Sequence, residues 1–131
     1  MQTERFEKMA DIMNTNGLIN TIKLDDVKGK LRLANAINAA DSLNNHVNEW
    51  FTLVDVVQKP GIRSINNTEC TDTYLCTKEG AVYFTQSEGI KNAAFFYASI
   101  FEGDFGDGIV VKCVEEKLDG GKTIKKLVAK I

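Results

Sequence analysis

One stretch of the chain changes from a strand pattern to a helix pattern within a few residues: residues 80–103, which read GAVYFTQSEGIKNAAFFYASIFEG. Residues 81–86 are small, β-branched or aromatic, which is typical of a strand. The apolar residues that then follow helical spacing are Ile90, Ala93, Ala94, Tyr97 and Phe101. Either Thr85 or Ser87 can cap this helix, and Glu88 follows Thr85 at the spacing of a capping box. The stretch therefore predicts a strand that turns directly into a long apolar helix.

Strand patterns flank this helix on both sides. Three of them lead up to it, at 50–58 (WFTLVDVVQ), 73–78 and 81–86, and two follow it, at 109–116 and 122–130. Lys59, Pro60 and Gly61 form a turn signature after the first strand, so a polar loop is predicted from 61 to 72. Glu79 and Gly80 predict one tight hairpin, and residues 119–121 (DGG) predict another.

The first 46 residues have mainly helical patterns. Residues 3–13 place Phe6, Met9, Ala10 and Met13 on one helical face, and residues 18–24 are either a short strand or an extended linker. A second helix is predicted to begin after Asp25 or Asp26, or only at Lys30 because Gly29 costs about 1 kcal/mol inside a helix. Its alanine-rich pattern predicts an end near residues 44 and 45.

Composition excludes several classes of protein. At 131 residues the chain has the length of one domain, and a net charge of -2 argues against binding nucleic acid by bulk positive charge. The N-terminal residues are amphipathic and charged, and no stretch has the length of a membrane span, so we expect a cytoplasmic protein. Cys76 and Cys113 lie in strand patterns and are expected to be buried.

Catalytic and metal-binding patterns are poorly represented. The single histidine, His46, has no recognisable nucleophile or acidic partner motif and is expected at the surface or at a cap. The run GDFGDG lacks the framework of a calcium loop, and no phosphate-binding glycine pattern is present in the sequence. We therefore expect no enzyme activity, no metal and no cofactor.

The order of elements from Trp50 onward is three strands, a helix and two strands. This order resembles an oligonucleotide/oligosaccharide-binding fold, a five-stranded, partly open barrel whose second and third strands and two loops form the binding face. The fold class expected from the resemblance is α+β, mainly β. The prediction is a single domain, with a helical N-terminal extension at 1–46 and the barrel at 47–131.

Aromatic and cationic residues on such a face can bind a single nucleic-acid strand, by stacking on bases and by contacting phosphates. If Leu75, Val82 and Phe84 fill the barrel, strand alternation places Tyr74, Lys78 and Tyr83 together on its outer face. The alternative is that both tyrosines are ordinary packed strand residues. Trp50 joins this set if it lies beside the groove.

The C-terminal end of the chain is locally basic. Residues 112–131 contain six lysines and three acidic residues, and Lys59 and Arg63 are expected to extend the same cationic rim. The alternative is a solvated edge strand that lysines protect from aggregation. The complete set of residues predicted to contact nucleic acid is Trp50, Lys59, Arg63, Tyr74, Lys78, Tyr83, Lys112, Lys117, Lys122 and Lys126.

Three sequence stretches, LANAINAADSL, WFTLVDVVQ and YFTQSEGI, are similar to small single-stranded DNA-binding proteins of phages of Gram-positive bacteria. The resemblance implies a DNA-coating role in phage replication or recombination, inside the host cytoplasm and without catalytic residues. RNA is the alternative nucleic acid, and a phage regulator or inhibitor that binds a host protein is the alternative function. Because the long helix is apolar around most of its circumference, a homodimer or higher oligomer is also expected, unless the N-terminal helices cover the second face.

Overall fold

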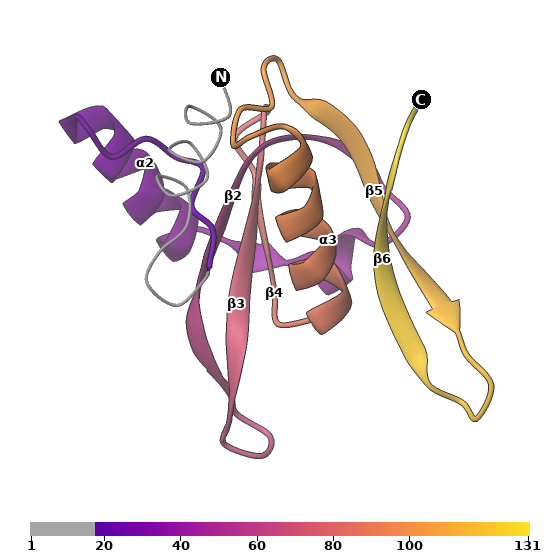
Figure 1. Ribbon diagram of the computed structural model, residues 1–131. Helices are drawn as coiled ribbons and strands as arrows, with labels where there is room; N and C mark the ends of the chain where they lie inside the picture. Colours follow the sequence, from indigo (N-terminus) through magenta and orange to yellow (C-terminus); the bar gives the residue numbers. More distant parts are fainter. Residues whose placement is uncertain (1–17) are drawn as a thin grey trace.

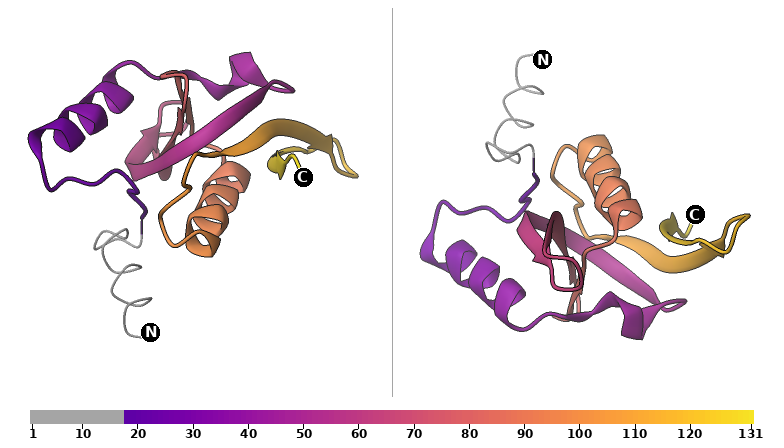
Figure 2. Two further views of the ribbon diagram at one scale, coloured as in Figure 1. Left: turned by 90° about the horizontal axis from the view of Figure 1, so that it is seen from above. Right: turned by 90° about the horizontal axis from the view of Figure 1, so that it is seen from below.

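The computed structural model describes residues 18–131, so the helix predicted at residues 3–13 lies outside the described part of the chain. Its fold is mixed α+β: one curled six-stranded sheet forms a half-barrel, in the order β1-β4-β3-β2-β5-β6 (Figure 1). Two longer helices, α2 and α3, lie on opposite sides of this sheet (Figure 2). Helix α3 lies on the concave side and α2 on the convex side.

The described elements are the helices α2 (Val27–Asn38) and α3 (Glu88–Ile100), the short 3-10 helix η1 (Leu43–His46), and the strands β1 (Asp41–Ser42), β2 (Trp50–Arg63), β3 (Thr68–Thr77), β4 (Val82–Thr85), β5 (Ile109–Lys117) and β6 (Thr123–Ala129). From Trp50 onward the order of strands and helix is the predicted one. Most neighbouring strands are antiparallel, whereas β1 and β4 are parallel.

The predicted five-stranded topology is wrong, because a sixth strand comes from the region expected to be helical. Helix α2 ends at Asn38, and β1 then pairs with β4, so that β1 and β6 are the two edges of an open sheet. The Asp41 carboxylate accepts a hydrogen bond from the backbone N–H of Ser42, and the Ser42 hydroxyl accepts one from that of Asn44. Such local side-chain bonds compete with a continuing helix.

The turn predicted at residues 59–61 is also wrong, because β2 continues through Pro60 to Arg63. A register shift lies between Leu53 and Asp55 of β2: residues 50–53 pair with β5, whereas Leu53 and the residues from Asp55 onward pair with β3. Pro60 therefore lies where β2 no longer has β5 beside it, and edge positions tolerate a residue without an N–H. Bulges of this kind increase local twist, which accounts for the curl of the sheet.

The larger hydrophobic core lies between α3 and the concave side of the sheet. Ile90, Ala94 and Ala98 of α3 are fully buried there against Leu53, Leu75 and Val111. Of the two predicted caps, Ser87 is the N-cap: its hydroxyl accepts a hydrogen bond from the backbone N–H of Ile90. The predicted strand-to-helix switch is thus confirmed, with the helix beginning at Glu88.

A second, smaller core lies beneath α2 on the convex side. Ala36 packs there with Val57, Tyr74 and Cys76. Asp26 is the N-cap of α2, since its carboxylate accepts a hydrogen bond from the backbone N–H of Gly29. Within residues 18–131, α2 packs over β3, β4 and the adjoining part of β2, and no other helix packs on the convex side.

A buried carboxylate ties α2 and the segment before it to the sheet. One oxygen of Asp55 accepts a hydrogen bond from the Thr21 hydroxyl at 2.7 Å, and the other accepts one from the Arg32 guanidinium at 2.6 Å. Residues 18–24, predicted as a short strand or an extended linker, form no strand of the sheet, but Asn20 makes an isolated antiparallel bridge with Val57. Backbone hydrogen bonds from Thr21 to Val56 and from Gln58 to Ile19 hold residues 19–21 along β2.

Candidate nucleic-acid interface

The two tyrosines expected on one outer face lie on opposite sides of the sheet. Tyr74 is opposite Phe84, and Leu75 is opposite Tyr83, so the predicted assignment of Phe84 to the barrel interior is wrong. Tyr74 is 5% exposed beneath α2, and its ring lies 5.3 Å from that of Phe84. Burial raises the pKa of Tyr74. In this arrangement α2 prevents a base from stacking on Tyr74.

Tyr83 lies on the concave side, where it contacts other aromatic rings. The His46 ring stacks on it with centroids 4.1 Å apart, and the Phe51 ring meets it edge-on at 5.1 Å. His46 Nε2 lies 2.7 Å from a carboxylate oxygen of Asp41, and this hydrogen bond lowers the pKa of Asp41. His46 is therefore a half-buried packing residue rather than a surface residue, and it covers one face of Tyr83.

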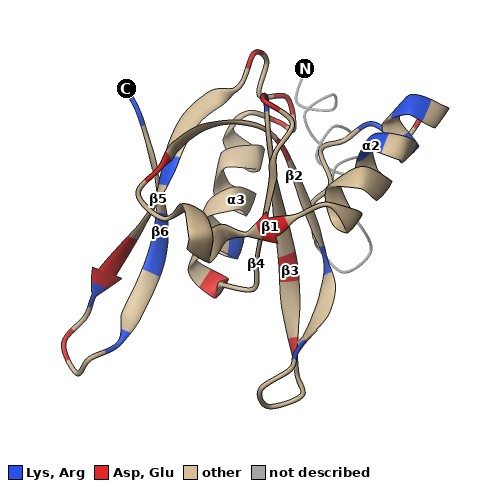
Figure 3. Ribbon diagram, turned by 180° about the vertical axis from the view of Figure 1, so that it is seen from behind, with Lys and Arg blue, Asp and Glu red and all other residues tan. Residues whose placement is uncertain are grey.

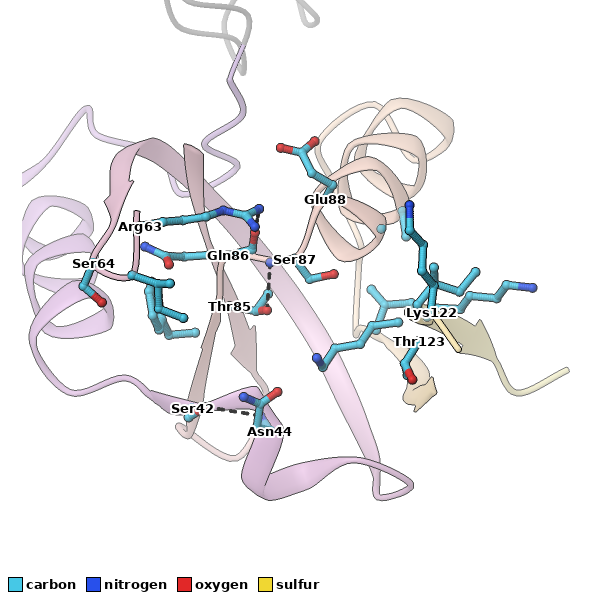
Figure 4. A pocket seen from close by; sticks show the side chains of 18 of the residues that line it. Ser42, Asn44, Arg63, Ser64, Thr85, Gln86, Ser87, Glu88, Lys122 and Thr123 are labelled. Carbon is cyan, nitrogen blue, oxygen red and sulfur yellow. Dashed lines mark hydrogen bonds between the residues drawn. The ribbon is translucent and has the colours of Figure 1, made fainter. Parts of the chain in front are cut away.

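An open cleft of about 1290 Å³ lies between the β2–β3 loop and the β5–β6 hairpin. Its floor is formed by the end of β4, the connection to α3 and the first turn of α3, including Thr85, Gln86 and Ser87. Figure 4 shows Arg63 and Gln86 on one side of the cleft, with Lys122 and Thr123 on the other. Two chain segments about sixty residues apart thus face each other across a polar floor.

Positive charge dominates the walls of this cleft. Arg63 donates a hydrogen bond to the backbone carbonyl of Gln86 at 3.1 Å, which holds its guanidinium at the rim. Among residues 18–131, the cationic residues that line the cleft are Arg63, Lys122, Lys125 and Lys126, and the one acidic lining residue is Glu88. Hydroxyl and amide groups supply the remaining polar lining. Such a surface can bind an anionic, hydrogen-bonding chain.

Trp50 does not line the cleft: it lies on the convex side, in the half of the sheet that α2 leaves uncovered. It is 45% exposed and pairs with Lys112 of β5, whose Nζ lies 4.5 Å from the centroid of the indole ring. The Nζ of Lys130 lies 5.8 Å from the same centroid. The alternation of β2, β5 and β6 places Trp50, Val110, Lys112, Val114, Glu116, Lys126 and Val128 on this surface, and Lys130 joins them through its contact with the indole ring; we call this surface the Trp50 face.

The other predicted cations have different surroundings. Lys59 lies within β2, and its Nζ is 3.1 Å from a carboxylate oxygen of Asp72, a hydrogen bond that raises the pKa of Lys59. Lys126 pairs with Glu116. Lys78 is exposed in the turn after β3, Lys117 ends β5, and Lys122 precedes β6. Figure 3 shows the basic segments of β5 and β6 near the acidic end of β5.

Sequence reasoning missed Lys125 and Lys130 as site residues. Lys125 lines the cleft, and Lys130 is close to Trp50. The alternation of residues 122–130 indicates which of these lysines share a face, but only the pairing of β5 with both β2 and β6 brings Lys130 to Trp50. Because this pairing joins strands that are far apart in the sequence, local patterns do not predict it.

No protein-family model matches this sequence, and comparisons with curated proteins and with solved structures also find no match. Within residues 18–131, no group of three or more histidine, cysteine, aspartate or glutamate side chains is placed to hold a metal ion. No helix in the same range is long and apolar enough to cross a membrane.

Proposed function

We propose that this protein binds single-stranded DNA without catalysis and independently of base sequence, coating it during phage DNA replication or recombination. The observation that carries the proposal is the cationic cleft, in which Arg63 faces Lys122 and Lys125 across a hydroxyl- and amide-rich floor. A phosphodiester chain matches this surface in charge and in hydrogen-bonding capacity.

The arrangement of the half-barrel supports the same proposal. Strands β2 to β6 resemble an open oligonucleotide-binding barrel, in which the loop between the first two strands and the loop between the last two flank the ligand. The corresponding segments here are residues 64–67 and 118–122, and both lie at the cleft or next to it. Helix α2 covers the convex side of β3 and β4, so the ligand is assigned to the cleft rather than to Tyr74.

The test is a titration of labelled oligothymidylate followed by fluorescence anisotropy over a series of salt concentrations. We expect binding that weakens with salt, with a log–log slope of about -0.7 for each phosphate contact. Replacing Lys122 by alanine removes one cation from the cleft and is expected to reduce the slope by about 0.7. Parallel titrations with RNA and with duplex DNA establish the preferred nucleic acid.

Lys30→Ala is the matched control, because Lys30 is also exposed but lies on α2 and does not line the cleft. It is expected to bind like the unmodified protein. A flat isotherm at low salt, with the circular dichroism spectrum of a folded protein, would refute the proposal. Equal effects of Lys122→Ala and Lys30→Ala would show that only overall charge matters.

One observation favours a second function, a protein-interaction module. Phe96, Ile100 and Phe101 on the outer side of α3 are 62%, 54% and 38% exposed, which is a large apolar surface for one helix. A second copy of this chain or a host protein would bury it. Light scattering distinguishes these cases: a mass that doubles with concentration, and that Phe96→Ser returns to the monomer value, indicates self-association through α3.

A further inference from the structure

The Trp50 face meets the cleft only at Lys126, and nothing in the described part of the chain covers it. Helix α2 packs on the convex side of β3 and β4, whereas Trp50 is 45% exposed and Val110 is 36% exposed. The face is formed by three antiparallel strands, with neighbouring strands about 4.8 Å apart. Trp50, Lys112 and Val128 are directly opposite one another across these strands.

The charges on this face select for an anionic ligand. It contains three lysines, at 112, 126 and 130, and one carboxylate, Glu116, which already pairs with Lys126. Among the described residues, Lys112 and Lys130 have no carboxylate partner, and both ammonium groups lie near the indole ring instead. A cation–π contact at an exposed site is weak, so a phosphate can recruit either lysine at little cost.

The indole ring supplies the second component of single-strand binding. A nucleobase can stack on an exposed aromatic ring whatever its identity, while nearby lysines contact the phosphates on either side. Because an acidic peptide would use the lysines but has no base to stack on the indole, a single nucleic-acid strand is the ligand that uses both components. The valines on either side provide apolar contact for base edges.

Lys126 connects this face to the cleft. It lines the cleft, and its strand position places it opposite Val114 in the outward-facing set. Along β6, Lys126, Val128 and Lys130 follow one another on one face at intervals of about 7 Å. A chain that leaves the cleft at Lys126 therefore reaches Trp50 by crossing the outer side of β6.

We propose, on the basis of the function proposed above, that the Trp50 face is a second contact site for the same DNA strand. The strand occupies the cleft first, passes over β6 at Lys126, and stacks one base on Trp50 between Lys112 and Lys130. Short oligonucleotides then fill the cleft alone, and longer ones reach both sites.

The first test uses the unmodified protein and two oligothymidylates of about 6 and about 16 nucleotides, which lie within the range of site sizes for such folds. Trp50 is the only tryptophan of the chain, so its fluorescence reports on this face alone. We expect both oligonucleotides to bind by anisotropy, but only the longer one to quench the tryptophan. Binding of the longer one without quenching would overturn the proposal.

The second test replaces Trp50 by alanine. Affinity for the longer oligonucleotide should fall by about 5-fold to about 150-fold, as expected for the loss of one base–aromatic stack, and affinity for the shorter one should not change. Leu31→Ala is the matched control, because Leu31 is a 59% exposed apolar residue on α2, which packs over β3 and β4 and not on this face. An equal loss with both lengths, or no loss with either, would overturn the second site.

A lysine pair gives an independent measurement. Replacing Lys112 and Lys130 together by alanine removes two phosphate contacts and should reduce the salt slope for the longer oligonucleotide by about 1.4. The salt slope for the shorter oligonucleotide should not change. Failure of both oligonucleotides to bind would instead refute the proposed function itself. The two failures are therefore distinguishable.

Discussion

Replacing Gly89 by alanine should destabilise the protein, although the same change stabilises most helices. Gly89 lies in the first turn of α3, where alanine would ordinarily contribute up to about 1 kcal/mol. A Cβ at this position would overlap the backbone carbonyl oxygen of Lys125 in β6. Seven register pairs hold β6 against β5, so the strand cannot move away locally. Overpacking costs roughly 1–3 kcal/mol, and a clash with backbone belongs at the upper end of that range, so a net loss of about 2 kcal/mol remains after the gain in helix propensity is subtracted.

The assay is urea unfolding followed by circular dichroism, with the transition midpoint and slope fitted for each variant. Asn92→Ala is the matched control, because Asn92 is exposed in the same helix and gains propensity without new contacts. Gly89→Ala should unfold at lower urea than the unmodified protein, and Asn92→Ala at equal or higher urea. If Gly89→Ala is as stable as Asn92→Ala, then β6 does not pack against the first turn of α3, and this wall of the cleft is wrongly described.

Two further predictions concern the convex core. Asp55→Ala should lower the free energy of unfolding by about 1–3 kcal/mol in urea titrations, because it leaves the buried Thr21 hydroxyl without its acceptor. Asp55→Asn keeps an acceptor oxygen and should lose less stability. Equal losses for the two variants would contradict this role of Asp55. Burial raises the pKa of Cys76 from 9.0 to about 12, so the unfolded chain releases this proton first and stability falls as the pH rises above 9. At pH 10 the loss should be about 1.4 kcal/mol, and Cys76→Ala should abolish that part of the pH dependence; an unchanged dependence would show that Cys76 is not buried as described.

Local sequence signals predicted a helix or strand well where the residues of that element alone determine its structure. The strand-to-helix switch at residues 82–100 and the two C-terminal strands formed close to their predicted bounds, because periodicity, caps and glycine turns act over a few residues. Burial of Cys76 and Cys113 followed from the same strand patterns and is confirmed. The two errors near residues 41 and 60 arose where tertiary pairing overrode local propensity.

The candidate site was less predictable, because it depends on which face of each strand is covered. The register of β3 and β4 places Tyr74 with Phe84 and Tyr83 with Leu75, and no local pattern specifies that choice. Lys59 was predicted to extend the cationic rim for a similar reason. Its partner Asp72 lies opposite it in the pairing of β2 with β3, and no local sequence pattern reveals that pairing. The cleft requires two distant hairpins to meet, which periodicity alone does not reveal.

Helix α2 has a direct consequence for the energetics of the proposed DNA binding. It covers Tyr74, and His46 and Phe51 pack against Tyr83, so Trp50 is the most exposed of the aromatic residues predicted to stack on bases. One stack contributes roughly 1–3 kcal/mol, so most of the affinity must come from phosphate contacts. Six cations are placed to make them: Arg63, Lys112, Lys122, Lys125, Lys126 and Lys130. If all six contact phosphates, the salt slope approaches about -4, so binding should be much tighter at low salt and depend little on base sequence.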